Sequence, residues 1–543
     1  MRNPRRTRLR LHSALLLAAL GLTVGGCGAD GGNDAGSDAA VDASTGVDGV
    51  GGTDGTANTD TDDIAVQTAD ADASDDTADT IQVVTGPGPS DLDCPPGTTQ
   101  QKQTSFFPTW WCATPNGMRH GPYKRWNNNG VLVLSRYYVN GNPEGLWKSW
   151  DGNGNLVSEE NWKNGKRHGT TKRWYPSGVL QSVQTFQDGK QQGEQKGFWS
   201  DGSKQSVAHY VDGKPDGVHE GWYQDGAKQY RYSYENGQAT GTWNQWYPDG
   251  TKQQETVYIA GKREGVERWW WPDGTVQRET LWKDGKRDGF DRGFFQSGSK
   301  QYERTYANNQ PQGTWTYWYE SGGKQSEQHY VDSKPDGTWT TWYEGGDIAT
   351  ITGYQSGQLH GLQQTYAPGG VKQAEIPWVA GKREGTEKAW SAAGQQTFAL
   401  DWKAGQKDGV ERRWADNGTL ISEGAWQANK RHGDWKAWYP DGKKMNEATW
   451  QNDLLEGPFV AWYQNGNKAM QHAYWQGGYD GQRLAWYSDE TLARDEGWSK
   501  GTKHGRHQRW KPDGGWLEGS CWQNGSLLWT AKDADQSETK ACP

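Results

Sequence analysis

The chain contains little of the aliphatic material from which a thick hydrophobic core is built. Only 32 % of its 543 residues are apolar, and much of that fraction is aromatic, with 35 Trp and 24 Tyr. Long helices are excluded through most of the chain, because Gly recurs about every dozen residues and costs roughly 1 kcal/mol within a helix. This composition favours a thin structure in which aromatic side chains cover one another.

An excess of positive charge and recognisable catalytic motifs are also missing. The net charge of −9 comes from residues 28–93, which contain sixteen Asp and no Lys, Arg or Glu, whereas the chain from Cys94 onward is close to neutral. Nucleic-acid binding needs a basic footprint, which is absent. There is no nucleotide-binding glycine loop, nucleophile elbow or zinc-protease helix. We therefore expect no enzymatic activity, no cofactor, no metal site and no nucleic-acid partner.

The first 26 residues are typical of an export signal. An arginine-rich start precedes the apolar run 14–20, and the segment then ends at Val24-Gly25-Gly26-Cys27. This segment resembles a bacterial lipoprotein signal, and the resemblance implies that Cys27 is lipidated and anchors the protein in the cell envelope, with the outer membrane as the expected location. The alternative is an ordinary secretory signal with a chance cysteine. No other apolar run approaches the roughly 20 residues that a membrane-spanning helix needs.

Residues 27–93 follow the signal and consist mostly of Asp, Ala, Gly, Thr and Ser. A segment with so few large apolar side chains is predicted to be disordered. As a random coil it would span roughly 45 Å. We expect it to act as a tether that lifts the folded part away from a membrane surface.

A repeat of 24 residues dominates the remainder. Gly recurs at this interval from Gly121 to Gly505, seventeen times without insertion or deletion. With this Gly as position 1, positions 6 and 18 are aromatic in every unit, and position 10 is Gly except at Glu490. Position 21 is Gly with four exceptions: Asn309, Ser333, Asn429 and Asp453. Such repetition supplies the same residues along a line, so it predicts an extended, non-enzymatic protein.

Each unit contains two turn signals, around positions 8–10 and 19–21, separated by runs rich in Trp, Tyr, Thr, Gln and Val. We predict an all-β fold, an extended single-layer antiparallel β-meander with two strands per 24-residue repeat. Pro248-Asp249-Gly250 suits a three-residue loop, and three-residue loops at both turns would place positions 6 and 18 on one face as an aromatic ridge. The Asn and Asp residues that replace Gly indicate a left-handed backbone at position 21.

Positions 3 and 7 are then expected on the other face, where they vary from unit to unit. Several units carry aromatic residues there, and these form a candidate binding face: Trp147, Trp243, Tyr247, Trp315, Tyr319, Trp339, Tyr343, Trp435 and Tyr439. The alternative is that these rings only extend the packing of the sheet. Position 24 is often titratable, as at His168 and Glu384, and we interpret this position as part of a solvated turn rather than as a row of acid–base groups.

The four cysteines beyond Cys27 lie in pairs outside the repeats. Cys94 and Cys112 precede the first unit, whereas Cys521 and Cys542 lie at the end of the last. A disulfide needs Cα atoms within roughly 6 Å, so an extended array permits only Cys94–Cys112 and Cys521–Cys542. We predict an N-terminal cap at residues 94–120, seventeen repeats at 121–528 and a C-terminal cap tail at 529–543. A zinc site is the rival interpretation.

The units resemble the bacterial variant of the MORN repeat. The shared pattern is Gly-x-Trp-x-x-Trp-Tyr-x-x-Gly followed by aromatic-x-x-Gly-Lys, and it is clear in residues 241–265. The resemblance extends over about three quarters of the chain. It implies a β-hairpin array. Similar bacterial proteins are often labelled antitoxins, which implies neutralisation of a cytoplasmic toxin.

These observations favour a non-enzymatic, lipid-anchored scaffold that binds another macromolecule, with a protein preferred, or that has a structural role. Membrane contact would occur through the lipid alone. Carbohydrate or cell-wall binding through exposed Trp and Tyr is the first alternative, because repeated weak sites gain avidity. An antitoxin or immunity protein is the second.

Overall fold

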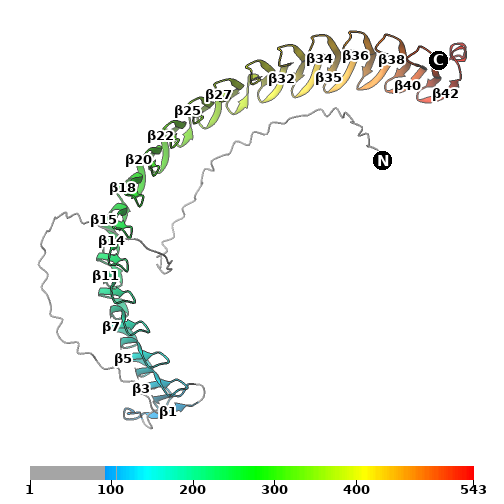
Figure 1. The fold of residues 1–543 in the computed structure, drawn as a ribbon. Helices are drawn as coiled ribbons and strands as arrows, with labels where there is room; N and C mark the ends of the chain where they lie inside the picture. The colour runs from blue at the N-terminus through cyan, green and yellow to red at the C-terminus, as the bar shows by residue number, and fades with distance from the viewer. Residues whose placement is uncertain (1–91, 105–106) are drawn as a thin grey trace, which may run out of the picture. The chain divides into compact units, whose positions relative to one another are not determined.

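The structure, a computed structural model, describes residues 92–104 and 107–543. These residues form one antiparallel sheet of 42 strands, and a short helix, α1 (Ala534–Thr539), follows the last strand. Figure 1 shows the hairpins following one another in chain order from β1 to β42. The sheet is open, since β1 pairs with β2 and β42 with β41. The predicted all-β antiparallel meander is therefore confirmed.

Most repeats contribute two strands of six to nine residues, and in five places a bulge separates a two-residue strand from its continuation. The first half of the sheet contains β1 (Thr99–Gln103), β2 (Thr109–Ala113), β3 (Arg119–Trp126), β4 (Leu132–Val139), β5 (Asn142–Trp150), β6 (Leu156–Lys163), β7 (Lys166–Trp174), β8 (Leu180–Gln187), β9 (Lys190–Gln191), β10 (Gly193–Phe198), β11 (Lys204–Val211), β12 (Lys214–Pro215), β13 (Gly217–Trp222), β14 (Lys228–Glu235), β15 (Gln238–Trp246), β16 (Lys252–Ile259), β17 (Lys262–Arg263), β18 (Gly265–Trp270), β19 (Val276–Lys283), β20 (Lys286–Phe294) and β21 (Lys300–Ala307). The second half contains β22 (Gln310–Trp318), β23 (Lys324–Val331), β24 (Lys334–Pro335), β25 (Gly337–Trp342), β26 (Ile348–Gln355), β27 (Gln358–Tyr366), β28 (Lys372–Val379), β29 (Lys382–Arg383), β30 (Gly385–Trp390), β31 (Gln396–Lys403), β32 (Gln406–Trp414), β33 (Leu420–Gln427), β34 (Lys430–Trp438), β35 (Lys444–Gln451), β36 (Leu454–Trp462), β37 (Lys468–Trp475), β38 (Gly478–Trp486), β39 (Leu492–Ser499), β40 (Thr502–Trp510), β41 (Trp516–Gln523) and β42 (Ser526–Ala531).

The first turn of each unit is the three-residue loop that its sequence predicts. In the unit that begins at Gly241, the Tyr247 N–H donates to the Thr251 carbonyl at 2.8 Å, and the Gly250 N–H donates to the Tyr247 carbonyl at 2.9 Å. Gly250 has a φ of 85°, which the glycine at position 10 adopts without strain. The loop therefore consists of positions 8–10.

A β-bulge follows this turn and changes which residues share a face. Trp246 lies opposite Lys252, whereas Gln245 lies opposite Gln254, so one residue of β16 is left without a partner. The register shifts by one, and every later side chain of the second strand changes face. Position 18 consequently shares a face with positions 3 and 5 rather than with position 6. The predicted ridge of positions 6 and 18 is wrong because the turn sequence does not reveal this bulge.

The second turn is shorter than expected. Ile259 pairs with Lys262, so the loop contains only Ala260 and Gly261, whose φ angles of 48° and 79° match a type I′ turn. The predicted three-residue loop is wrong here. The predicted left-handed backbone at position 21 is confirmed, since the four residues that replace Gly all have φ between 65° and 69°: Asn309, Ser333, Asn429 and Asp453.

A wider bulge explains the glycine that defines the repeat. Between the pairs Ser233–Thr240 and Arg231–Asn244, three residues of β15 lie opposite a single residue of β14. The first of the three is the position-1 glycine, Gly241. Its counterparts in all units have φ between 64° and 125°, a region that other residues rarely adopt. The repeat glycine therefore fixes a bulge, whereas the glycines of positions 10 and 21 fix turns.

The two ends of the array carry the expected disulfides. Cys94 and Cys112 have Cα atoms 5.6 Å apart, and the Cα atoms of Cys521 and Cys542 are 5.8 Å apart. The N-terminal cap begins before Cys94, because Leu92 is buried and its N–H donates to the Gln100 side chain. At the other end α1 contacts β41 and β42. The predicted signal peptide, the Cys27 lipidation site and the tether up to residue 91 lie outside the described residues.

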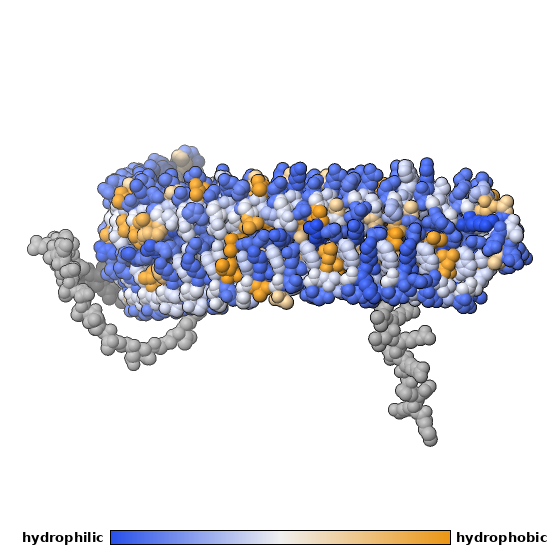
Figure 2. Space-filling model, turned by 90° about the horizontal axis from the view of Figure 1, so that it is seen from above, coloured by the Kyte–Doolittle hydropathy of each residue, from blue (hydrophilic) through white to orange (hydrophobic). Residues whose placement is uncertain are grey.

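Hydrophobic side chains do not form one continuous stripe on the side of the array that Figure 2 shows. Hydrophilic residues predominate there, and hydrophobic residues occur in separate patches. Within the described part of the chain, no helix has the length and apolar character needed to cross a membrane.

Candidate binding surface

The face that carries positions 3, 5, 7, 14, 16 and 18 contains the aromatic side chains proposed as a binding surface. Trp315 illustrates the role of position 3. Its indole N–H donates to the Thr305 carbonyl at 2.9 Å, and its ring centroid lies 5.1 Å from Tyr306 and 4.7 Å from Tyr330. Only 9 % of Trp315 is exposed. The other position-3 tryptophans donate in the same way to the carbonyl of position 17 in the preceding unit: Trp147, Trp243, Trp339 and Trp435.

The position-7 tyrosines also bind the backbone of the array. The Tyr319 hydroxyl donates to the Trp342 carbonyl of the next hairpin at 2.8 Å. Equivalent bonds of 2.9 Å are made by three further candidates: Tyr247, Tyr343 and Tyr439. The polar side-chain atom of each of the nine candidate residues is therefore hydrogen-bonded within the sheet. This is the packing role that we gave as the alternative.

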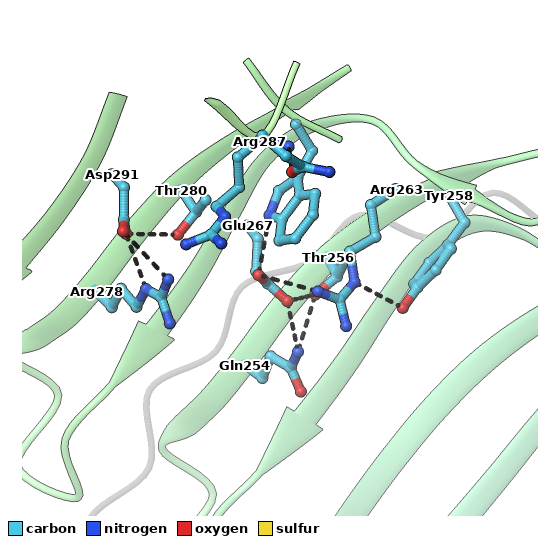
Figure 3. Close-up of polar contacts among 11 residues, drawn as sticks. Gln254, Thr256, Tyr258, Arg263, Glu267, Arg278, Thr280, Arg287 and Asp291 are labelled. Carbon is cyan, nitrogen blue, oxygen red and sulfur yellow. Dashed lines mark hydrogen bonds and ion pairs between the residues drawn. The ribbon is translucent and has the colours of Figure 1, made fainter. Parts of the chain in front are cut away.

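Some units place a carboxylate at position 3 instead of an aromatic ring. Glu267 is only 4 % exposed and accepts hydrogen bonds from Thr256 and Gln254 at 3.1 Å (Figure 3). The Trp282 indole N–H donates to its other oxygen at 3.0 Å, and the Arg263 guanidinium lies 3.8 Å away. A buried carboxylate is stable only with such partners. Position 3 is therefore an interior position that either an aromatic ring or a carboxylate can occupy.

Asp291, one unit further on, is completely buried. Its carboxylate accepts from Arg278 through two bonds of 2.9 and 3.3 Å and from the Thr280 hydroxyl at 3.0 Å (Figure 3). Arg304 lies 3.8 Å away, and its guanidinium also lies over the Tyr302 ring at 3.8 Å from the centroid. Asp291 thus holds Arg278 by hydrogen bonds and lies within ion-pair distance of Arg304 on this face of the sheet.

A groove lies beside this cluster. Two adjoining hollows of about 600 and 450 Å³ share Phe295, Gln301, Tyr302 and Glu320 in their lining. Trp269 and Arg278 line the larger hollow, and Tyr317 lines the smaller. Volumes of this size fall within the usual range for small-molecule sites, roughly 300–1,000 Å³. We call this feature the Gly293 groove and define it by Trp269, Arg278, Phe295, Gln301, Tyr302 and Tyr317.

Gly293 lies at position 5 beneath the Tyr302 ring, which lines both hollows. Its neighbours at this position are Trp269 in the preceding unit and Tyr317 in the following one. A Cβ atom on Gly293 would lie 2.2 Å from the Tyr302 ring, so the ring rests directly on the glycine backbone. Burial raises the pKa of the Tyr302 phenol above its ordinary value, and the charge of Asp291 adds to this.

Our sequence interpretation missed these residues, although a signal was available. Trp269 and Tyr317 are the only aromatic residues at position 5 in the seventeen units. They flank one glycine, and position 5 is occupied elsewhere by Ala, Thr, Ser, Gln, Arg or Gly. Comparison of the units at each position would have identified the groove as the place where the repeat departs from its pattern.

The titratable side chains of position 24 link neighbouring turns. The Glu264 carboxylate accepts from the Asp284 N–H at 2.8 Å, and Glu144 accepts from the Asn164 N–H at 2.7 Å. The same bond to position 20 of the next unit recurs along the array, at residues that include Asp216, Asp336, Glu384, Asp408 and Asp480. These groups stabilise turns, which agrees with our interpretation.

A buried histidine occupies position 16 near the C-terminal end. His472 is 5 % exposed, and its ring lies 4.6 Å from that of Phe459 at position 3. Burial lowers the pKa of His472 to about 4, and the charge of Arg483 adds to this. In residues 92–104 and 107–543, no three His, Cys, Asp or Glu side chains lie close enough together to hold a metal ion.

Five segments match the family model described as the MORN repeat variant: residues 143–164, 167–188, 263–284, 311–332 and 431–452. Each match begins at position 23 of one unit and ends at position 20 of the next, so one match is one hairpin around the three-residue turn. The chain therefore contains MORN-variant repeats at several places along the array.

A comparison with curated protein sequences finds no match. Among solved structures, the chain is similar to the crystal structure of TcdB2-TccC3 without its hypervariable C-terminal region, at 10 % identity and a TM-score of 0.11. The alignment covers 80 % of this chain but only 31 % of that one. A TM-score this low supports no structural or functional comparison.

Proposed function

We propose that this array of MORN-variant repeats is a non-enzymatic scaffold of the cell envelope, anchored by a lipid on Cys27, which holds a binding surface for another macromolecule away from the membrane. The observation that carries this proposal is the recurrence of the same contacts between neighbouring repeats from one disulfide-linked cap to the other. An array whose units each contact only their neighbours can be long and still ordered.

The side chains at the repeating positions support a scaffold rather than a catalyst. Position-3 tryptophans, position-7 tyrosines and most position-24 carboxylates bind backbone atoms of the adjacent unit, as at Trp315, Tyr319 and Glu264. Their polar atoms are therefore engaged in holding the units together. We therefore expect binding at the places where the repeat pattern is broken.

The caps support the same function. An open sheet exposes unpaired N–H and C=O groups at both edges, and these promote association between sheets. Here each edge strand belongs to a segment closed by a disulfide, and α1 contacts the C-terminal edge strand. Such ends suit a protein that remains a discrete rod in an oxidising compartment.

Cell fractionation tests the anchoring part of the proposal. The full chain should sediment with membranes and incorporate a palmitate analogue, whereas the Cys27→Ala variant should do neither. A wild-type protein that stays in the soluble fraction would contradict the proposal. Crosslinking in intact cells followed by recovery of the chain then identifies what the scaffold holds, with the Cys27→Ala strain as the control for location.

A further inference from the structure

We propose that the Gly293 groove binds a neutral polysaccharide built of β-linked pyranose rings. This inference rests on the scaffold function above, because it names the class of macromolecule that the scaffold holds. It depends on three features of the groove: two aromatic walls, a fixed set of polar groups and a length that matches the repeat of the sheet.

The walls of the groove are Trp269 and Tyr317, which are half-buried and lie two repeats apart. Adjacent strands are about 4.8 Å apart, so one repeat advances by about 10 Å along the sheet and the two rings are separated by about 20 Å. The advance per repeat is similar to the length of one disaccharide in an extended β-linked glycan. The flat C–H faces of such sugars pack on aromatic rings, so both walls can contact one polysaccharide chain at once.

The polar groups suit sugar hydroxyls. Gln277 and Gln301 provide amides that can both donate and accept, and the exposed Glu320 provides a carboxylate. The buried Asp291 binds Arg278 through Nε and Nη2, which leaves the remaining guanidinium N–H groups for a ligand. A small number of fixed polar groups among aromatic walls is the usual composition of a ligand site.

Contacts within the protein already hold the side chains of the groove in place before a ligand binds. Tyr302 rests on the Gly293 backbone on one side and is covered by the Arg304 guanidinium on the other. Arg278 is fixed by a carboxylate that has no exposed surface. Binding therefore does not have to order these side chains, which lowers the entropic cost of binding.

Charge and backbone pairing favour a neutral glycan over an acidic glycan or a peptide. Arg278 and Glu320 carry opposite charges in the lining, so the groove has no excess of positive charge to attract a polyanion. The strands that line it, β18 to β23, are paired on both sides and offer no free edge for an added peptide strand.

The test measures binding of the purified full chain to insoluble cellulose, chitin and xylan, and to their soluble oligosaccharides by titration calorimetry, with polygalacturonate as the anionic comparison. We expect binding to at least one neutral ligand. The double variant Trp269→Ala, Tyr317→Ala should bind it at least tenfold more weakly. Both substitutions should leave the fold intact, because Ala389 and Ala437 occupy position 5 in other units.

Thr341→Ala is the matched control, since it changes position 5 in a unit outside the groove and should leave the affinity unchanged. Absence of binding to every neutral polysaccharide would overturn the proposal, as would binding that the double variant retains or binding to polygalacturonate alone. A protein partner that is captured by the wild type and lost from the double variant would assign the groove to a peptide and also overturn it.

The outcomes for the groove and for the scaffold can be separated. Loss of sugar binding with Cys27-dependent membrane location retained would contradict only the groove assignment. Sugar binding by a protein that never reaches the membrane fraction would contradict only the anchored scaffold.

Discussion

Two neighbouring stretches of the buried face have the same strands and first turns but opposite chemistry at position 3. In residues 254–306 the position-3 side chains are Glu267 and Asp291, which accept hydrogen bonds from hydroxyl, amide, indole and guanidinium groups. In residues 306–354 they are Trp315 and Trp339, which donate to backbone carbonyls and pack between tyrosines at tilted ring angles. The three-residue turn and the bulge that follows it do not change between the two stretches. The second bulge is displaced by one residue, since residues 288–290 lie opposite Leu281 whereas residues 313–315 lie opposite Arg304.

This comparison shows that the glycines determine the backbone and that position 3 is interior whatever residue occupies it. A tryptophan fills the position with one ring and one donor. A carboxylate needs a set of partners instead, and the partners are positioned on neighbouring strands at 254, 256, 278 and 280. The acidic stretch thus differs from the aromatic stretch at several positions together, and the Gly293 groove lies beside it.

The largest effect is expected from Asp291→Ala. The substitution leaves Arg278 and Arg304 without their carboxylate. Because both arginines reach solvent, the cost should lie below the roughly 3–5 kcal/mol of a broken, fully buried ion pair. Long repeat arrays do not unfold in one step, so local amide hydrogen exchange is the suitable measurement. Amides of β19 to β21 should exchange faster in the variant, and Glu344→Ala at an exposed turn should change nothing. Unchanged exchange in β19 to β21 would show that the two stretches do not differ as we describe.

A smaller effect is expected from Thr280→Val, which keeps the shape of the side chain and removes the hydroxyl that donates to Asp291. A hydrogen bond to a charged group contributes about 1.5–3 kcal/mol. The free energy of local opening that amide exchange reports for β19 and β20 should fall by that amount. The same change at Thr340, on the other face of β25, is the control. Equal effects at the two threonines would contradict a special role for the acidic stretch.

Trp315→Phe tests the aromatic stretch and should have a still smaller effect. The ring can still stack with Tyr306 and Tyr330, and only the bond to the Thr305 carbonyl is lost. Loss of one neutral hydrogen bond costs about 0.5–1.5 kcal/mol. Exchange in β21 to β23 reports the change. If Trp315→Phe were as damaging as Asp291→Ala, the indole N–H rather than ring packing would stabilise this stretch.

The smallest effect at neutral pH concerns His472, a buried residue at position 16 near the C-terminal end. Its pKa in the folded protein, about 4, lies below the ordinary value of 6.5. The unfolded segment therefore takes up the proton first, and local stability decreases as the pH falls from 6.5 towards 4. Exchange in β36 to β38 should accelerate over this range and should not do so in His472→Leu. Acceleration of the same size in both proteins would rule out His472 as the cause.

Sequence reasoning identified the elements but not the register. The strands, the first turn and the left-handed position 21 follow from residue types with strong backbone preferences, such as Asp249-Gly250 and Asn309. Both disulfides follow from the positions of the cysteines at the two ends of the array. The bulge after the first turn was missed because no residue type marks it, and a shift of one residue reverses the faces. The second bulge is marked by the position-1 glycine, which our sequence interpretation used only to define the repeat. The groove was missed because it depends on the absence of a side chain at Gly293 and on a buried charge at Asp291.

The central claim is that position 3 is interior and packs against position 18. Hydroxyl-radical footprinting of the unmodified protein, with the oxidation rate of each tryptophan read by mass spectrometry, tests it most directly. We predict that Trp315, which is 9 % exposed, is oxidised slowly and that Trp475, which is 44 % exposed, is oxidised fast. Oxidation of Trp315 as fast as that of Trp475 would mean that position 3 faces solvent, and the register described here would be contradicted.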